Sequence, residues 1–188
     1  MTEASELSGL FCELSIPFEW TAADKADTAT AVTPAEELAN QNCLKIVLGL
    51  DDVSHDANDD VLEVSYELQR LDFKVNVILE LVGQLVSQNL SLPARHAVKL
   101  GPSSIRWRTQ ASPAEVGQRL RLKLFPDQRF PFPLCLRGRV ATLEQVEQDW
   151  EIRLELDQMH EYTQDLLEKY IFRCHRRHIA RMKTQINK

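Results

Sequence analysis

Residues 97–108, AVKLGPSSIRWR, decide the fold class of this chain. Apolar and charged residues alternate on both sides of the tripeptide Gly101-Pro102-Ser103, and this alternation is typical of strands with one buried face. Glycine and proline in that tripeptide favour a turn. The segment therefore predicts two short antiparallel strands joined by a turn.

The same alternation recurs on both sides of this hairpin. In the upstream segment, residues 9–21, apolar residues occupy every second position from Leu10 to Trp20, and Pro17 favours an edge position for the strand. Downstream, three similar segments follow: RLRLKL (119–124), LCLRGRVA (134–141) and WEIRLELD (150–157). About six short strands, each with one charged face, predict a small antiparallel β-barrel.

A long helix with a heptad repeat is predicted from about residue 59 to residue 89. This stretch contains no proline, and only Gly83 weakens it. Every a and d position is aliphatic over four heptads: Val61, Leu68, Val75 and Val82 at a, and Val64, Leu71, Ile78 and Leu85 at d. A sustained repeat of 3.5 residues keeps one seam against a partner helix, so we expect a coiled coil between chains. The alternative is an amphipathic helix on the domain's own core, for which the period would be 3.6.

The heptad positions alone leave the number of helices in the coiled coil open. Leu79 and Leu81 flank the seam and favour an oligomer larger than a dimer, whereas valine at a with leucine at d favours two strands. A second apolar stripe on the outer face is expected to pack against the first helix. It consists of Leu62, Tyr66, Phe73 and Val77.

Two other helices complete the predicted domain. The first begins at Pro34, because Thr33 and Glu36 can form a capping box there. An acidic loop at 51–60 follows it, and this loop either binds calcium or complements the positive end of the next helix. We predict one domain over residues 1–188, with a first strand at 9–21, an inserted helical region at 34–90, the other strands at 92–157 and a C-terminal helix at 159–187.

Composition and motifs disfavour several classes of protein. A net charge of −6 disfavours nucleic-acid binding. No uncharged apolar stretch approaches the length of a membrane span, and the four cysteines form no C-x-x-C pair, so we expect a cytoplasmic protein with reduced thiols and no membrane insertion.

No nucleophile elbow, P-loop, zinc-protease or dinucleotide motif occurs, and we expect no enzymatic activity. Cys174, His175 and His178 offer metal ligands, but a zinc site usually needs ligands from a second segment.

The order of these segments resembles the PilZ family. The matching pattern runs through VKLGPSSIRW (98–107), Gly117 with the leucines of 120–124, LRGRV (136–140) and LLEKYIFRCHRR (166–177). PilZ domains are six-stranded barrels, and many bind the bacterial second messenger cyclic di-GMP. The N-terminal strand and the inserted helices look like the atypical, oligomeric branch of the family. The resemblance thus implies an α+β fold whose helices assemble four chains.

The ligand motif of the family is altered in this chain. PilZ domains bind cyclic di-GMP through R-x-x-x-R followed by [D/N]-x-S-x-x-G, and here the second motif reads Lys99, Gly101 and Ser104, while Arg95 has no arginine four residues away. Lysine has no acceptor for a guanine edge, and the lost arginines remove bidentate contacts. We therefore expect weak or no binding in the usual mode and no other cofactor. Arg95, Lys99 and Arg106 remain candidates for holding a phosphate.

The sequence as a whole predicts a non-enzymatic signalling or scaffold protein. By resemblance, it is a homo-oligomer with four chains, whose barrels contact signalling or pilus proteins in cyclic di-GMP-linked regulation of pili, motility or virulence. The alternative is a true cyclic di-GMP receptor that uses nonstandard residues.

Overall fold

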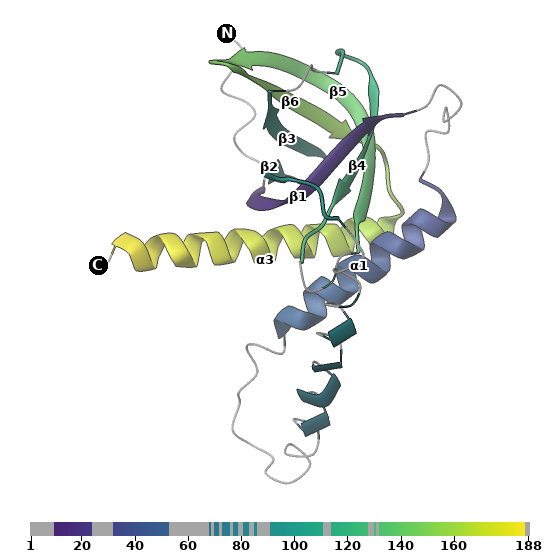
Figure 1. Cartoon of the computed structure of the whole chain (residues 1–188), viewed down its shortest axis with the longest axis vertical. Helices are drawn as coiled ribbons and strands as arrows, with labels where there is room; N and C mark the ends of the chain where they lie inside the picture. Colours follow the sequence, from purple (N-terminus) through teal and green to yellow (C-terminus); the bar gives the residue numbers. More distant parts are fainter. Residues whose placement is uncertain are drawn as a thin grey trace.

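The computed structural model of the chain (Figure 1) shows a barrel with two crossed helices at one end. It describes residues 10–23, 32–52, 91–110, 114–127, 130 and 132–186, together with the helical positions 68, 70, 71, 73–75, 77, 78, 81, 82 and 85. The latter positions are here called the stalk residues.

Six strands among the described residues form a closed antiparallel barrel. They are β1 (Cys12–Ala22), β2 (Arg95–Leu100), β3 (Ser104–Thr109), β4 (Arg119–Leu124), β5 (Leu134–Val146) and β6 (Asp149–Leu156). Their order around the barrel is β1-β2-β3-β6-β5-β4. The prediction of an α+β fold with a six-stranded antiparallel barrel is therefore confirmed.

The prediction that β1 is an edge strand was wrong. Residues Cys12 to Pro17 pair with β2, and residues Phe18 to Ala22 pair with β4, so both sides of β1 are used. Pro17 lies where β1 changes partner. Because the strand needs no continuous ladder at that point, the missing N–H of proline is tolerated there. The carbonyl of Pro17 still accepts a hydrogen bond from the Phe125 N–H at 3.1 Å.

The alternating apolar residues fill the barrel interior. Leu120, Leu122 and Leu124 of β4 are almost fully buried, and Trp107 packs its ring edge-to-face on Phe18 at 5.3 Å between centroids. Gly138 of β5 lies directly against β6. A Cβ atom at that position would lie 2.1 Å from the backbone oxygen of Glu155, so the barrel has no room for any side chain there.

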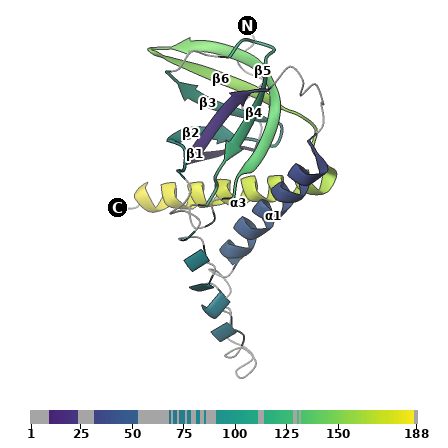
Figure 2. The same cartoon turned by 45° about the vertical axis from the view of Figure 1, so that its right-hand side comes forward.

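Two helices cross at one end of the barrel, as both views show (Figure 2). They are α1 (Pro34–Asp52) and α3 (Glu161–Ile186), and they pack against each other, with α1 also contacting β5 and α3 contacting β1. The predicted capping box is confirmed. The Thr33 N–H donates to the Glu36 carboxylate at 3.2 Å, and the Glu36 N–H donates to the Thr33 hydroxyl at 3.3 Å.

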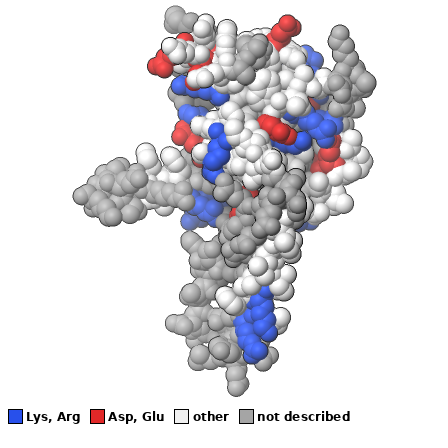
Figure 3. Space-filling model, in the orientation of Figure 1, with Lys and Arg blue, Asp and Glu red and all other residues white. Residues whose placement is uncertain are grey.

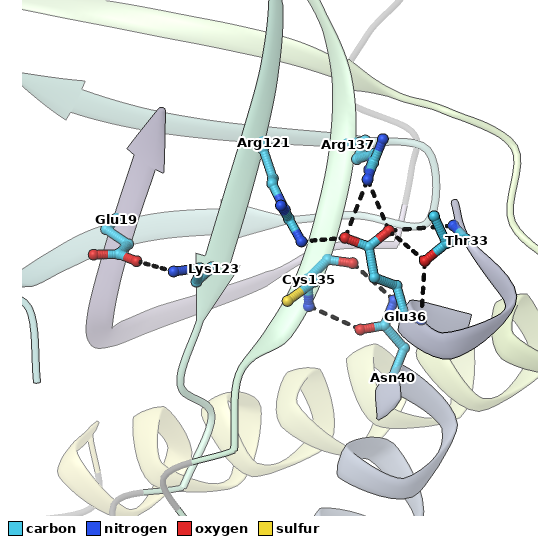
Figure 4. Close-up of polar contacts among 8 residues, drawn as sticks. All are labelled: Glu19, Thr33, Glu36, Asn40, Arg121, Lys123, Cys135 and Arg137. Carbon is cyan, nitrogen blue, oxygen red and sulfur yellow. Dashed lines mark hydrogen bonds and ion pairs between the residues drawn. The ribbon is translucent and has the colours of Figure 1, made fainter. Parts of the chain in front are cut away.

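Asn40 anchors α1 to the barrel. The start of β5 extends beyond β6, which pairs with β5 only from Gly138 onward. The Asn40 amide occupies this free strand edge: its Nδ2 donates to the Cys135 carbonyl at 2.7 Å, and its Oδ1 accepts from the Cys135 N–H at 2.8 Å (Figure 4). Asn40 is fully buried, and these bonds satisfy backbone groups that would otherwise lack partners.

The stalk residues lie on the opposite side of α1 and α3 from the barrel in both views (Figures 1 and 2). Phe73 is 69% exposed, so the prediction that the second apolar stripe packs against the first helix was wrong for this residue. Leu62 and Tyr66 of that stripe lie outside the described residues. Among the described helices, none is both long and apolar enough to cross a membrane.

Candidate functional site

A groove of about 510 Å³ lies along the outer face of the barrel. It crosses β1, β2, β3 and β6, and α3 contributes one residue to its rim. Its lining includes the charged or titratable side chains of Glu13, Lys99, Arg106, Arg108, Glu151 and His178. Acidic and basic groups are interspersed over the barrel, and Figure 3 shows the same mixture on the face that it displays.

The strand register places these charges in rows across the sheet. Glu13 lies opposite Lys99, Lys99 opposite Arg106, and Arg106 opposite Arg153. Like charges directly opposite each other are unfavourable unless an anion neutralises them. Part of this charge is compensated, because the Lys99 ammonium lies 2.9 Å from the Glu13 carboxylate. The hydrogen bond from Lys99 lowers the pKa of Glu13.

Lys99 and Arg106 line the groove, whereas the other predicted ligand residues do not. Gly101 and Ser104 close the turn between β2 and β3, where the Gly101 N–H donates to the Ser104 carbonyl at 2.8 Å. A Cβ at Gly101 would come no closer than 3.4 Å to any neighbour, so the backbone does not exclude the serine of the family motif. The guanidinium of Arg95 donates to the Ser15 carbonyl on β1.

Among the charged or titratable groove residues, four were not predicted as ligand residues from the sequence: Glu13, Arg108, Glu151 and His178. Arg108 follows Arg106 by two positions and faces the same side of the sheet, so the alternation of β3 was a usable signal for it. Its guanidinium lies 3.1 Å from the Glu151 carboxylate on β6. His178 reaches the groove only because α3 packs beside β1, and no local pattern indicates that contact.

His175 of α3 makes a structural contact with the segment that precedes β1. Nδ1 of His175 lies 3.0 Å from the Phe11 carbonyl, and its ring packs edge-on against the Phe11 ring. Within the described part of the chain, no group of three or more metal-binding side chains comes together. The acidic loop at 51–60 lies almost wholly outside the described residues.

A second polar cluster joins α1 to the barrel (Figure 4). The Arg137 guanidinium donates to both oxygens of the Glu36 carboxylate, at 2.8 and 3.1 Å, and Arg121 pairs with the same carboxylate. Burial acts to raise the pKa of Glu36, but the hydrogen bonds from Arg137 and Thr33 outweigh it, and the pKa is lowered. A charged Glu36 therefore holds α1 against β4 and β5.

Glu36 makes the stability of the domain depend on pH. Because its pKa is lower in the folded than in the unfolded chain, its contribution is complete at neutral pH and is lost as the pH falls through and below the ordinary range of a glutamate. We expect the urea midpoint to drop over that acidic window. In the Glu36→Gln variant, the midpoint should be lower at neutral pH and should change less on acidification. An equal pH slope in the two proteins would contradict the assignment.

The predicted oligomerisation seam is only partly described. Val61 and Val64 lie outside the described residues. The described seam residues are all 47–61% exposed in the single chain, and they are Leu68, Leu71, Val75, Ile78, Val82 and Leu85. Three more apolar side chains on the stalk are exposed on its other faces: Phe73, Val77 and Leu81.

The closed six-stranded barrel with helices packed at one end defines this chain as a PilZ-fold protein. The family model of the atypical PilZ domain, described as a cyclic di-GMP receptor, matches residues 44–184, and the chain belongs to that family. At the level of the family, these domains are receptors and not enzymes.

Two solved structures are similar to this chain. One is a pathogenic protein from Xanthomonas campestris, described as a new tetrameric PilZ domain that self-assembles through an unusual helical bundle. It is 26% identical, with a TM-score of 0.72 over 93% of this chain and 92% of that chain. The other is the Bacillus subtilis inhibitor of motility, MotI/DgrA, at 17% identity and a TM-score of 0.36 over 50% of this chain and 43% of that one. The comparison with curated protein sequences found no match.

Proposed function

We propose that this chain is a non-enzymatic signalling or scaffold protein that self-associates through the heptad helix, residues 61–85, into a tetramer. The observation that carries the proposal is the row of exposed aliphatic side chains on the stalk. The stalk lies on the opposite side of α1 and α3 from the barrel. Burying one leucine, valine or isoleucine stabilises an assembly by about 1.5–3 kcal/mol. A continuous row of such side chains is therefore expected to be covered by other chains.

Two observations favour four chains over two. The stalk exposes apolar residues on more than one face, and a helix in a four-helix bundle contacts two neighbours, whereas a helix in a dimer contacts one. The similar Xanthomonas campestris protein is described as tetrameric and assembled through a helical bundle. Sedimentation of the wild-type chain at tens of micromolar tests the assembly. We expect four times the chain mass of 21.6 kDa, and a monomer at that concentration would refute it.

We also propose that the barrel contacts protein partners in cyclic di-GMP-linked regulation, in the cytoplasm, with little binding of the dinucleotide in the usual mode. At the acidic or amide position of the family motif, Lys99 offers only donors, and it is paired with Glu13. The family likeness supports partners among signalling, pilus, motility or virulence proteins, and the tetramer would present several barrels to them.

A cyclic di-GMP receptor with nonstandard residues is the second candidate. The groove favours it, because Lys99, Arg106 and Arg108 line one open cavity and cations there suit phosphate groups. Titration calorimetry separates the two candidates. We expect no heat with high micromolar dinucleotide. Measurable binding that is lost in the Arg106→Ala variant would instead establish the receptor.

A further inference from the structure

The start of β1 packs against α3 and brings two cysteines to one point of the interface. Both views show the first part of β1 directly over α3 (Figures 1 and 2). Just before the strand, the Phe11 carbonyl lies 3.0 Å from Nδ1 of His175, and the two rings pack edge to face at 6.4 Å between centroids. Cys12 follows Phe11 in the sequence, and Cys174 precedes His175, so the same contact places the two cysteines side by side.

The side chains of these two cysteines interact directly. Cys12 is almost fully buried in the hydrophobic core, and the partly buried Cys174 packs against that core. Both are thiols in this structure. The hydrogen bond to the Cys174 sulfur, followed by burial, holds the pKa of Cys12 well above its ordinary value. A disulfide requires two cysteine side chains that already face each other at short range, and a hydrogen-bonded pair of thiols meets that condition.

The two thiols differ in their access to solvent, and this difference sets the order in which they react. Cys174 keeps some exposure, whereas Cys12 has almost none, so a dissolved reagent reaches Cys174 first. The hydrogen bond favours the protonated form of Cys12, so Cys174 is the member of the pair that ionises more readily. The thiolate is the reactive form of cysteine, and Cys174 is therefore the attacking residue, with Cys12 as the resolving residue.

The pair lies next to the rim of the groove on the barrel. Glu13, the residue after Cys12 on β1, lines this groove. His178, one helical turn after Cys174 on α3, contributes to the same rim. A covalent bond between the two cysteines would therefore fix the position of α3 relative to β1 at the edge of the groove.

We propose that Cys12 and Cys174 form a redox modification site, at which a small-molecule disulfide oxidises the two thiols to a reversible disulfide within one chain. The Cys174 thiolate attacks one sulfur of the small disulfide, which forms a mixed disulfide and releases one small thiolate. The Cys12 thiolate then attacks the Cys174 sulfur and releases the second small thiolate. The two protein thiols lose two electrons and two protons, and the small disulfide takes them up to become two thiols. This inference does not depend on the proposed self-association.

The bond is expected to open again in the presence of excess thiol. Disulfides in cytosolic proteins are usually transient and redox-sensing, and the exchange that forms this bond runs in both directions. In the reduced state α3 is held on β1 by packing and by the contact of His175 with Phe11. In the oxidised state the same two elements would be joined covalently.

The test is peptide mapping of the folded wild-type chain after incubation with oxidised glutathione. The remaining thiols are alkylated, and the peptides are analysed by mass spectrometry without reduction. We expect a peptide pair linked through Cys12 and Cys174. We also expect a urea midpoint about 1 M higher than that of the protein treated with dithiothreitol, because the long closed loop restricts the unfolded chain.

Two serine variants show which thiols are required. Cys174→Ser should lose both the linked peptide and the shift of the urea midpoint. Cys135→Ser is the matched control, because it removes another partly exposed thiol, and it should keep both. The side chain of Asn40 bonds only to the backbone of Cys135, so this substitution leaves the anchor of α1 in place.

Three outcomes would overturn the proposal. In the first, glutathione stays on Cys174 as a mixed disulfide and Cys12 does not displace it. In the second, the linked peptide forms only when urea is present during oxidation. In the third, non-reducing gel electrophoresis shows a covalent dimer joined through Cys174 of two chains. The mapping of the wild type uses no substitution, so a variant that fails to fold does not affect the result.

Discussion

The double variant Leu71→Asp/Ile78→Asp is expected to sediment as a monomer at concentrations where the wild type is a tetramer. Both residues occupy d positions of the proposed seam, and both are more than half exposed in the single chain. In the assembled bundle their side chains would be buried among aliphatic residues. An unpaired carboxylate there costs several kcal/mol, and each tetramer would contain eight of them.

The control places the same two carboxylates on another face of the same helix. Gln69→Asp/Asn76→Asp keeps the spacing of seven residues but uses heptad position b, so the tetramer should persist. Circular dichroism of the monomeric variant should retain the strand signal, because no seam residue belongs to the barrel. If Leu71→Asp/Ile78→Asp kept the size of the wild type on gel filtration, the heptad row would not be the interface.

The Gly138→Ala variant should lose about 3 kcal/mol of stability or fail to fold. Overpacking a core typically costs about 1–3 kcal/mol, and the cost is highest where the backbone has to move. The added Cβ would lie 2.1 Å from the backbone oxygen of Glu155 and 2.3 Å from a methyl carbon of Leu154. The leucine side chain can move, but the Glu155 carbonyl belongs to the β5–β6 ladder. Equilibrium urea unfolding at a fixed chain concentration measures the loss.

Gly49 provides the matched comparison. It lies in α1, and a Cβ there would meet nothing within 4 Å. Gly49→Ala should therefore leave the barrel intact and stabilise the protein by up to about 1 kcal/mol, since alanine is the better helix former. Equal stability of Gly138→Ala and the wild type would show that β5 and β6 can separate at this point without cost.

The barrel was largely predictable from local pattern. Alternating residues such as Leu120, Leu122 and Leu124 predict a strand with one buried face, and the structure buries all three of them. The capping box at Thr33 and Glu36 also follows from spacing alone, because its bonds join residues three positions apart. The edge position predicted from Pro17 was wrong, because no local sequence pattern indicates that a strand changes its pairing partner part-way along its length.

The candidate site was predicted less completely. Lys99 and Arg106 could be chosen from a family motif, but the pairing of Lys99 with Glu13 depends on the register between β1 and β2. His178 enters the groove only through the packing of α3 on the barrel. Phe73 was predicted to pack against the first helix of its own chain, yet it is exposed. An apolar stripe predicts that a helix face is buried, but it does not indicate whether the same chain or another chain covers that face.

By itself, the sequence determined the strands, the helix start at Pro34 and the heptad row from Val61 to Leu85, because periodicity and capping arise from neighbours within a few residues. Only the tertiary structure decided that β1 pairs on both sides, that Gly138 must lack a side chain, and that Glu36 meets Arg137 across 101 positions. Those features depend on contacts between segments far apart in the chain, and local patterns in the sequence do not specify such contacts.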